Sequence, residues 1–156
     1  MADTRHVFTY GSLMFPAVWQ RVVEGAYESR EATVHGFQRL RIHGEHYPAL
    51  IVNPNAGPLA GRVYFDVSAS DIARLDHFES SHYARVSVAV TVAGAGAVTG
   101  ADSAEKTTLA ADAYLTLSAD ALEPVEWSPE RFAREGLESF LATYVAANTQ
   151  PRNLSD

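Results

Sequence analysis

The sequence of 156 residues contains no cysteine. Disulfide bonds and zinc sites with thiolate ligands are therefore excluded, and the composition fits a reducing compartment. Positive charge is also scarce, because 12 Lys and Arg residues stand against 19 Asp and Glu residues and give a formal net charge of −7. A general nucleic-acid-binding surface would be basic, so we expect no nucleic-acid partner. A small anion is not excluded, because one local pocket can be positive on an acidic protein.

Long apolar runs are missing as well. No stretch approaches the ~20 consecutive apolar residues that span a membrane, and we find no signal-peptide pattern. We therefore expect a soluble, cytoplasmic protein with no membrane partner. Hydrophobic residues make up 47% of the chain. This content is sufficient for one domain over residues 1–156, with a flexible tail from about residue 148.

The chain begins with a predicted strand, tight turn and helix. The strand covers residues 6–10, Gly11 and Ser12 break it, and Pro16 suits the first turn of a helix that ends by Gly25. Further strands are predicted from branched and aromatic residues between turn signals. They cover residues 34–42, 47–52, 59–67, 83–92 and 111–117.

Two more helices are predicted. One runs from Ser70, as the N-cap, to Glu79, and the other runs from Ser128 to about Ala147. Residues 93–106 are small and polar and indicate a flexible hairpin tip. Because helices are few and strands mostly sequential, we expect a mixed α/β fold. A small barrel-like mixed sheet with flanking helices fits this order better than a doubly wound parallel sheet.

The first candidate site is the segment from Phe8 to Met14, which contains the turn from Tyr10 to Leu13. Glycine between a strand and a helix permits a sharp turn and a close approach of ligand to backbone. The N–H groups that open the following helix can bind a carboxylate, a phosphate or an oxyanion. An ordinary turn between a strand and a helix is the alternative. The phosphate-loop pattern is absent.

The second candidate is the segment from Leu75 to Arg85, which holds two carboxylates, two histidines, a tyrosine and an arginine. Glu79 follows an aromatic residue at the end of a helix whose other face is apolar. If Glu79 is buried, desolvation raises its pKa toward neutrality, which suits a general base. A solvated helix end is the alternative interpretation.

Other patterns are weaker. His43 with His46, and His77 with His82, lack companions at a metal-ligand spacing, so we expect no metal. Ser12 is not in the Gly-x-Ser-x-Gly elbow of hydrolases. The side chains of Trp19, Trp127 and Tyr114 fit packing roles, and Tyr114 fits a pocket wall equally well. No pattern argues for a cofactor.

Five motifs in order resemble the gamma-glutamylcyclotransferase-like superfamily, in particular its AIG2-like branch. They are Val7-Phe8-Thr9-Tyr10-Gly11-Ser12-Leu13-Met14, Val34-His35-Gly36-Phe37, Tyr47-Pro48-Ala49-Leu50, Gly61-Arg62-Val63-Tyr64, and Leu75-Asp76-His77-Phe78-Glu79 followed by Tyr83-Ala84-Arg85. Tyr114 fits a late strand tyrosine of the family. Two departures are Ser80-Ser81, where many relatives have glycine or an acidic residue, and the long segment 93–106.

The resemblance implies an enzyme that cyclises a gamma-glutamyl amine, its small-molecule partner, to 5-oxoproline and releases the amine. It implies Glu79 as the catalytic acid/base. Expected substrate-binding residues are Tyr10, Gly11, Ser12, Leu13, Met14, Tyr83, Arg85 and Tyr114. Arg85 either offsets a substrate carboxylate or pairs with Asp76. If the φ of Gly11 is positive, the substitution Gly11→Ala is expected to destabilise the protein.

Two alternatives stay open. One is a non-catalytic binding or regulatory domain that keeps the cavity, and the other is a related enzyme for a different gamma-glutamyl amine. An enclosed Glu79 beside the Tyr10 turn favours catalysis, whereas an exposed or externally paired Glu79 favours binding. The leaving amine and the oligomeric state are not predicted.

Overall fold

The computed structural model describes residues 4–42, 48–79, 83–93, 106–116 and 122–142. Five strands form a closed barrel in the order β1-β5-β2-β6-β7. Neighbouring strands are antiparallel except β1 and β7, which are parallel and close the barrel. The barrel strands are β1 (Thr4–Thr9), β2 (Ser29–Val34), β5 (Leu59–Ser68), β6 (Tyr83–Ala93) and β7 (Lys106–Thr116).

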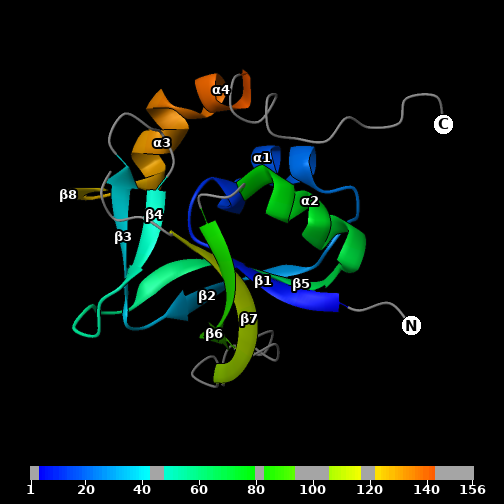
Figure 1. The fold of residues 1–156 in the computed structure, drawn as a ribbon, viewed down its shortest axis with the longest axis horizontal. Helices are drawn as coiled ribbons and strands as arrows, with labels where there is room; N and C mark the ends of the chain where they lie inside the picture. Colours follow the sequence, from blue (N-terminus) through cyan, green and yellow to red (C-terminus); the bar gives the residue numbers. More distant parts are fainter. Residues whose placement is uncertain (1–3, 43–47, 80–82, 94–105, 117–121, 143–156) are drawn as a thin grey trace.

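A second sheet and short helices complete the described part of the chain. The sheet has the order β4-β3-β8, with β3 (Phe37–Ile42), β4 (Pro48–Val52) and β8 (Leu122–Glu126). The helices are η1 (Ser12–Met14), α1 (Pro16–Val22), α2 (Ala69–Glu79), α3 (Pro129–Glu135) and α4 (Leu137–Phe140). Figure 1 shows α1 and α2 together on one side of the barrel and α3 beside the second sheet. Within the described ranges, no helix has the length and apolar character of a membrane span.

Adjacent residues of β1 serve two hydrophobic clusters, because successive side chains of a strand point to opposite faces. Phe8 packs inside the barrel, while Val7 faces the helices and packs in one cluster with Trp19 and Leu75. Trp19 is buried and stacks on Tyr64 with ring centroids 3.6 Å apart, which confirms its packing role. β1 thus contributes side chains to both hydrophobic clusters, one inside the barrel and one under the helices. The turn that begins at Tyr10 directly follows this strand.

The expected mixed α/β fold with a barrel and flanking helices is confirmed, but the strand predicted at 34–42 is wrong. β2 ends at Val34 and β3 begins at Phe37, in a different sheet. Gly36 lies between them with a φ of 84°, a left-handed conformation that glycine adopts without steric cost. This turn redirects the chain, and β2 and β8 were not predicted at all.

The last predicted helix is also divided. α3 begins after Ser128 as expected, but it ends at Glu135, and α4 begins at Leu137. Gly136 separates them and donates its N–H to the carbonyl of Phe132 at 2.8 Å. Glycine is a poor helix former, which accounts for the interruption. The predicted helix end near Ala147, the tail from 148, and the central part of the predicted hairpin tip lie outside the described residues.

The N-cap of α2 is Ser68 rather than Ser70. The helix begins at Ala69, and the Ser68 hydroxyl oxygen accepts a hydrogen bond from the N–H of Asp71 at 3.2 Å. This is the bond from the third helical residue that a serine cap ordinarily accepts. The predicted cap was therefore two residues too late.

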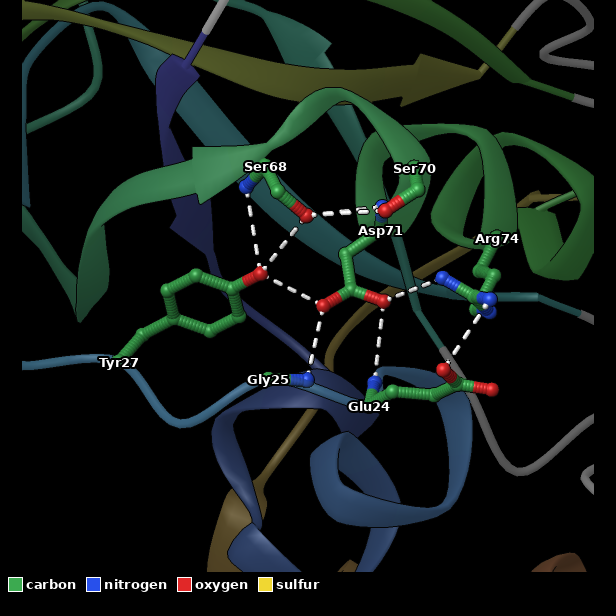
Figure 2. A network of polar contacts seen from close by, with 7 residues as sticks. All are labelled: Glu24, Gly25, Tyr27, Ser68, Ser70, Asp71 and Arg74. Carbon is green, nitrogen blue, oxygen red and sulfur yellow. Dashed lines mark hydrogen bonds and ion pairs between the residues drawn. The ribbon is translucent and has the colours of Figure 1, made fainter. Parts of the chain in front are cut away.

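A buried carboxylate joins the start of α2 to the end of α1 (Figure 2). Asp71 is 2% exposed and accepts hydrogen bonds from the N–H groups of Glu24 and Gly25, from the Tyr27 hydroxyl and from Arg74, at 2.6–3.0 Å. Burial alone would raise the pKa of Asp71, but these donors outweigh it and the pKa lies below its usual value. The network fixes one end of the helix whose other end carries Glu79.

Candidate active site

A narrow cavity of about 30 Å³ lies where the barrel, the second sheet and the helices meet. A cavity needs about 10–15 Å³ to hold one water molecule, so this one has room for only a few waters. A larger ligand therefore requires some of the lining side chains to move. The lining residues are Phe8, Thr9, Tyr10, Gly11, Ser12, Leu13, Pro48, Phe78, Glu79, Tyr83, Tyr114 and Phe140.

Most of the expected site residues share this cavity, although they lie in separate parts of the sequence. The Tyr10–Leu13 turn, Glu79, Tyr83 and Tyr114 all line it. Met14 does not, and packs against the hydrophobic cluster under the helices. Arg85 does not line it either, and its guanidinium pairs with Asp76 and Asp112.

Glu79 is the last residue of α2 and follows the buried Phe78, so the helix directs it toward the cavity. Desolvation is the main cause that raises the pKa of Glu79 to about 8, and the nearby Asp76 carboxylate adds to the rise. The rise in the pKa of Glu79 that desolvation would cause at this position is therefore present. Near neutral pH such a group exchanges a proton readily in either direction.

Three tyrosine hydroxyls in the cavity wall donate their protons to protein acceptors, and that of Tyr83 donates to the carbonyl of Pro48 at 3.0 Å. The Tyr10 hydroxyl donates to the carbonyl of Tyr114, and the Tyr114 hydroxyl donates to Oδ1 of Asp76 at 2.7 Å. Burial raises the pKa of the Tyr10 and Tyr114 hydroxyls above the usual value, so both stay protonated at neutral pH. Each hydroxyl oxygen therefore offers acceptor lone pairs rather than a proton to a ligand.

The Tyr10–Leu13 turn owes its glycine to space rather than to a left-handed backbone. Gly11 has a φ of −132°, so the condition under which an alanine here would strain the backbone, a positive φ, is not met. A Cβ at this position would lie 2.7 Å from the ring of Pro48 on β4. Directly after Gly11, the N–H groups of Ser12 and Leu13 open η1 and have no acceptor within the helix itself.

Arg39 on β3 ties this turn to the second sheet. Its guanidinium donates a hydrogen bond to the carbonyl of Tyr10 at 2.8 Å and lies over the ring of Trp127, 5.3 Å from the centroid. Trp127 is 5% exposed, in agreement with the expected packing role. Nothing in the sequence singles out Arg39, because it is one of several arginines in strands.

Three lining residues that residue chemistry did not single out are Pro48, Phe78 and Phe140. Pro48 and Phe78 belong to two of the motifs that carry the family resemblance. The resemblance was therefore the sequence signal that could have identified them as lining residues. Phe140 comes from α4 and showed only the apolar periodicity of a packed helix. Its place in the cavity wall depends on how the end of the chain folds back.

The described residues give no support to a metal site or to Ser12 as a nucleophile. Within the described ranges, no histidine lines the cavity beside Ser12, and no group of three or more possible metal ligands occurs. His77 is exposed on α2. The other candidates, His43, His46 and His82, lie outside the described residues, as do Ser80 and Ser81.

Comparisons with known proteins agree with this geometry. A family model described as gamma-glutamyl cyclotransferase, AIG2-like, matches residues 7–133. AIG2-like protein A of Arabidopsis thaliana is 31% identical over 140 residues, which cover 89% of this chain and 78% of that protein.

Solved structures share the fold. A solution structure of a protein from Arabidopsis thaliana has a TM-score of 0.62 and 26% identity, with 95% of each chain covered. A yeast gamma-glutamyl cyclotransferase, described as specific to glutathione, has a TM-score of 0.60 and 17% identity, with 99% of this chain and 91% of that chain covered. The barrel and its flanking helices are thus those of the gamma-glutamyl cyclotransferase fold.

Proposed function

The chain belongs to the gamma-glutamyl cyclotransferase, AIG2-like family, and on this basis we propose that it cyclises a gamma-glutamyl amine to 5-oxoproline and releases the amine. The observation that carries the proposal is the position of Glu79. Its carboxyl group lines the same cavity as the Tyr10–Leu13 turn, and its pKa is raised to about 8. A cytoplasmic location stays a prediction from the sequence.

In this reaction the α-amine of the gamma-glutamyl group attacks its own side-chain amide carbonyl. The nucleophile is already tethered to the electrophile, so correct orientation supplies a large part of the rate and no covalent enzyme intermediate is needed. The ammonium must first lose a proton to become nucleophilic. Ionised Glu79 accepts that proton, and a base with a pKa near the working pH is suited to this step.

The same group completes the reaction. After attack, the tetrahedral intermediate breaks its bond to the amide nitrogen, which needs a proton to leave as an amine. Protonated Glu79 donates that proton and returns to the ionised form. The ring nitrogen passes its remaining extra proton to the departing amine, which gives the neutral lactam of 5-oxoproline and an ammonium product. One carboxyl group thus serves as base and then as acid, because its pKa allows both forms near neutral pH.

The cavity walls supply the remaining contacts. The hydroxyl oxygens of Tyr10 and Tyr114 offer acceptor positions that fit an ammonium or amine donor near Glu79. The N–H groups of Ser12 and Leu13 fit a negative oxygen, which is either the substrate carboxylate or the oxyanion of the intermediate. Because the cavity is narrow, we infer that wall side chains move to admit the gamma-glutamyl group.

The substitution Glu79→Gln tests the assignment, because glutamine keeps the size of the side chain and cannot take up the proton. We expect release of 5-oxoproline to fall by ~10²–10⁴-fold, the usual contribution of acid/base catalysis. Circular dichroism should show an unchanged fold. The matched control is Glu135→Gln on the exposed face of α3, which should keep wild-type activity. Near wild-type turnover by Glu79→Gln would overturn the role of Glu79.

A further inference from the structure

Arg85 on β6 joins two carboxylates that belong to different elements. Its Nε donates to Oδ1 of Asp76 on α2 at 2.9 Å, and its Nη1 donates to Oδ2 of Asp112 on β7 at 2.7 Å. Asp112 is 5% exposed and has a second, longer contact with Arg5 on β1 at 3.4 Å. Arg85 therefore connects the end of α2 to two adjacent barrel strands.

This ion-pair chain reaches the cavity through Tyr114. Arg85 and Tyr114 are directly opposite each other in the pairing of β6 and β7. The Tyr114 hydroxyl donates to the same Oδ1 of Asp76 that accepts from Arg85. Asp76 precedes Glu79 by three residues, so the two carboxyl groups lie on one face of α2. Asp76 thus links the Arg85 guanidinium and the Tyr114 hydroxyl to the carboxyl group of Glu79.

The charged groups around Glu79 explain why its link to Arg85 through Asp76 affects acid/base chemistry. Among the described residues, the titratable and charged groups around Glu79 are Asp76 of α2, Tyr10 after β1, Tyr83 and Arg85 of β6, and Tyr114 of β7. The carboxylate of Asp76 raises the pKa of Glu79, because a second negative charge nearby disfavours ionisation. The Arg85 guanidinium is the cation in direct contact with that carboxylate.

We propose that Arg85 is a positioning residue for the acid/base site, a role that rests on the proposed function. Paired with Asp76 and Asp112 together, it holds the Tyr114 hydroxyl against the end of α2 and offsets the charge that Asp76 places beside Glu79. Of the two roles expected for Arg85, this one builds on its pairing with Asp76 rather than on a contact with a substrate carboxylate. It also accounts for a buried aspartate at position 112, which anchors the guanidinium from the barrel side.

The test is Arg85→Gln, which removes the cation and keeps the carboxyl group of Asp76 in place. The pKa of Glu79 should rise, and the acidic limb of the kcat profile should move to higher pH. Each unit of the rise lowers the ionised fraction of Glu79 at pH 7 by ~10-fold. Carbon-13 NMR of the glutamate carboxyl groups reads this titration directly, with the Glu79 signal assigned by its loss in Glu79→Gln. The KM should change little, whereas a substrate-carboxylate contact would raise it.

Matched variants separate this role from general damage. Arg5→Gln removes the other partner of Asp112 without touching Asp76, so the titration of Glu79 should stay as in the wild type. In an Asp76→Asn background, Arg85→Gln should no longer raise the pKa of Glu79. Arg85→Gln combined with Asp112→Asn avoids an underpaired buried carboxylate, and it should still show the rise if Arg85→Gln alone folds poorly. Arg85→Lys keeps the charge and should restore part of the shift.

A wild-type titration of Glu79 in Arg85→Gln, or an equal shift in Arg5→Gln, would overturn the proposal. A rise in KM with an unchanged pH profile would also overturn it and return Arg85 to substrate binding. The NMR titration needs no turnover, so it distinguishes this proposal from the reaction itself. If Glu79 responds to Arg85 and no gamma-glutamyl amine is cyclised, the proposed function fails while the electrostatic coupling stands.

Discussion

At the scale of single residues, the partial burial of Glu79 in the cavity wall, which suits acid/base chemistry, also opposes the charged form in the folded protein. An ordinary glutamate in an unfolded chain has a pKa of about 4.3, whereas the folded protein holds Glu79 at about 8. Between these values the unfolded chain releases a proton that the folded protein retains. Stability is therefore highest below about pH 4.3 as far as Glu79 is concerned, and declines as the pH rises through about 8.

This linkage predicts that Glu79→Gln is more stable than the wild type at pH 8. The difference should be small near pH 4 and should grow up to about pH 8, because glutamine has no charged form to desolvate. Each unit of pKa difference corresponds to about 1.4 kcal/mol of unfolding free energy. Urea unfolding of both proteins at several pH values measures it. Parallel stability curves between pH 4 and pH 8 would show that Glu79 is not desolvated.

The Gly11 backbone gives a second prediction at this scale. Its φ is unstrained for any residue, but an added Cβ would lie 2.7 Å from the Pro48 ring. Gly11→Ala should therefore destabilise the protein by about 1–3 kcal/mol through overpacking, and should reduce activity by shifting the turn. Gly57→Ala is the control, since its Cβ meets no atom within 4 Å. Equal midpoints of thermal unfolding for the two variants would contradict the steric account.

At the scale of elements, α2 is fixed at both ends by carboxylates. Asp71 bonds its first turn to the chain after α1, and Asp76 bonds its last turn to β6 and β7. The two sites act differently, because the donors around Asp71 stabilise its charge whereas burial disfavours that of Glu79. The helix thus starts at a hydrogen-bonded carboxylate and ends at a carboxyl group that lines the cavity and has a raised pKa.

Asp71→Asn should destabilise the protein by about 1–3 kcal/mol at pH 7, the usual effect of leaving buried donors imperfectly paired. The folded pKa of Asp71 lies below the unfolded value of about 3.9. Its contribution is therefore present above about pH 4 and is lost as the pH falls through the folded pKa. Denaturant unfolding at pH 7 and at pH 3 checks this, with Asp66→Asn as an exposed control. An equal difference at both pH values would contradict it.

The elements also show how far the sequence predicts this fold. Branched and aromatic residues between turn signals located β1, β4, β5, β6 and part of β7, and helix start and stop signals located α1 and α2. The same strand signals ran one predicted strand from Val34, the last residue of β2, through β3, since the left-handed turn at Gly36 does not interrupt the run of strand-forming residues. The pKa rise of Glu79 followed from its position on an apolar helix. The pairing of Arg85 with Asp112 did not, because it depends on the register between β6 and β7.

At the scale of the whole molecule, the cavity exists because the barrel, the second sheet and the helices meet beside β1. Its walls come from residues as distant as Phe8 and Phe140, with Pro48 contributed by the second sheet. No spacing in the sequence predicts this convergence, which depends on barrel closure and on the return of the last helices. The family resemblance anticipated the Tyr10 turn and Glu79 together because family motifs preserve such convergence.

The central claim is that the chain forms 5-oxoproline by internal cyclisation, and product analysis in ¹⁸O-labelled water tests it most directly. A panel of gamma-glutamyl amines is incubated with the wild-type protein and with Glu79→Gln. We predict that the wild type releases 5-oxoproline and free amine in equal amounts from at least one compound. The 5-oxoproline should carry no label from the solvent, and Glu79→Gln should be at least ~10²-fold slower. Labelled glutamate as the initial product, or no 5-oxoproline from any compound, would contradict the account.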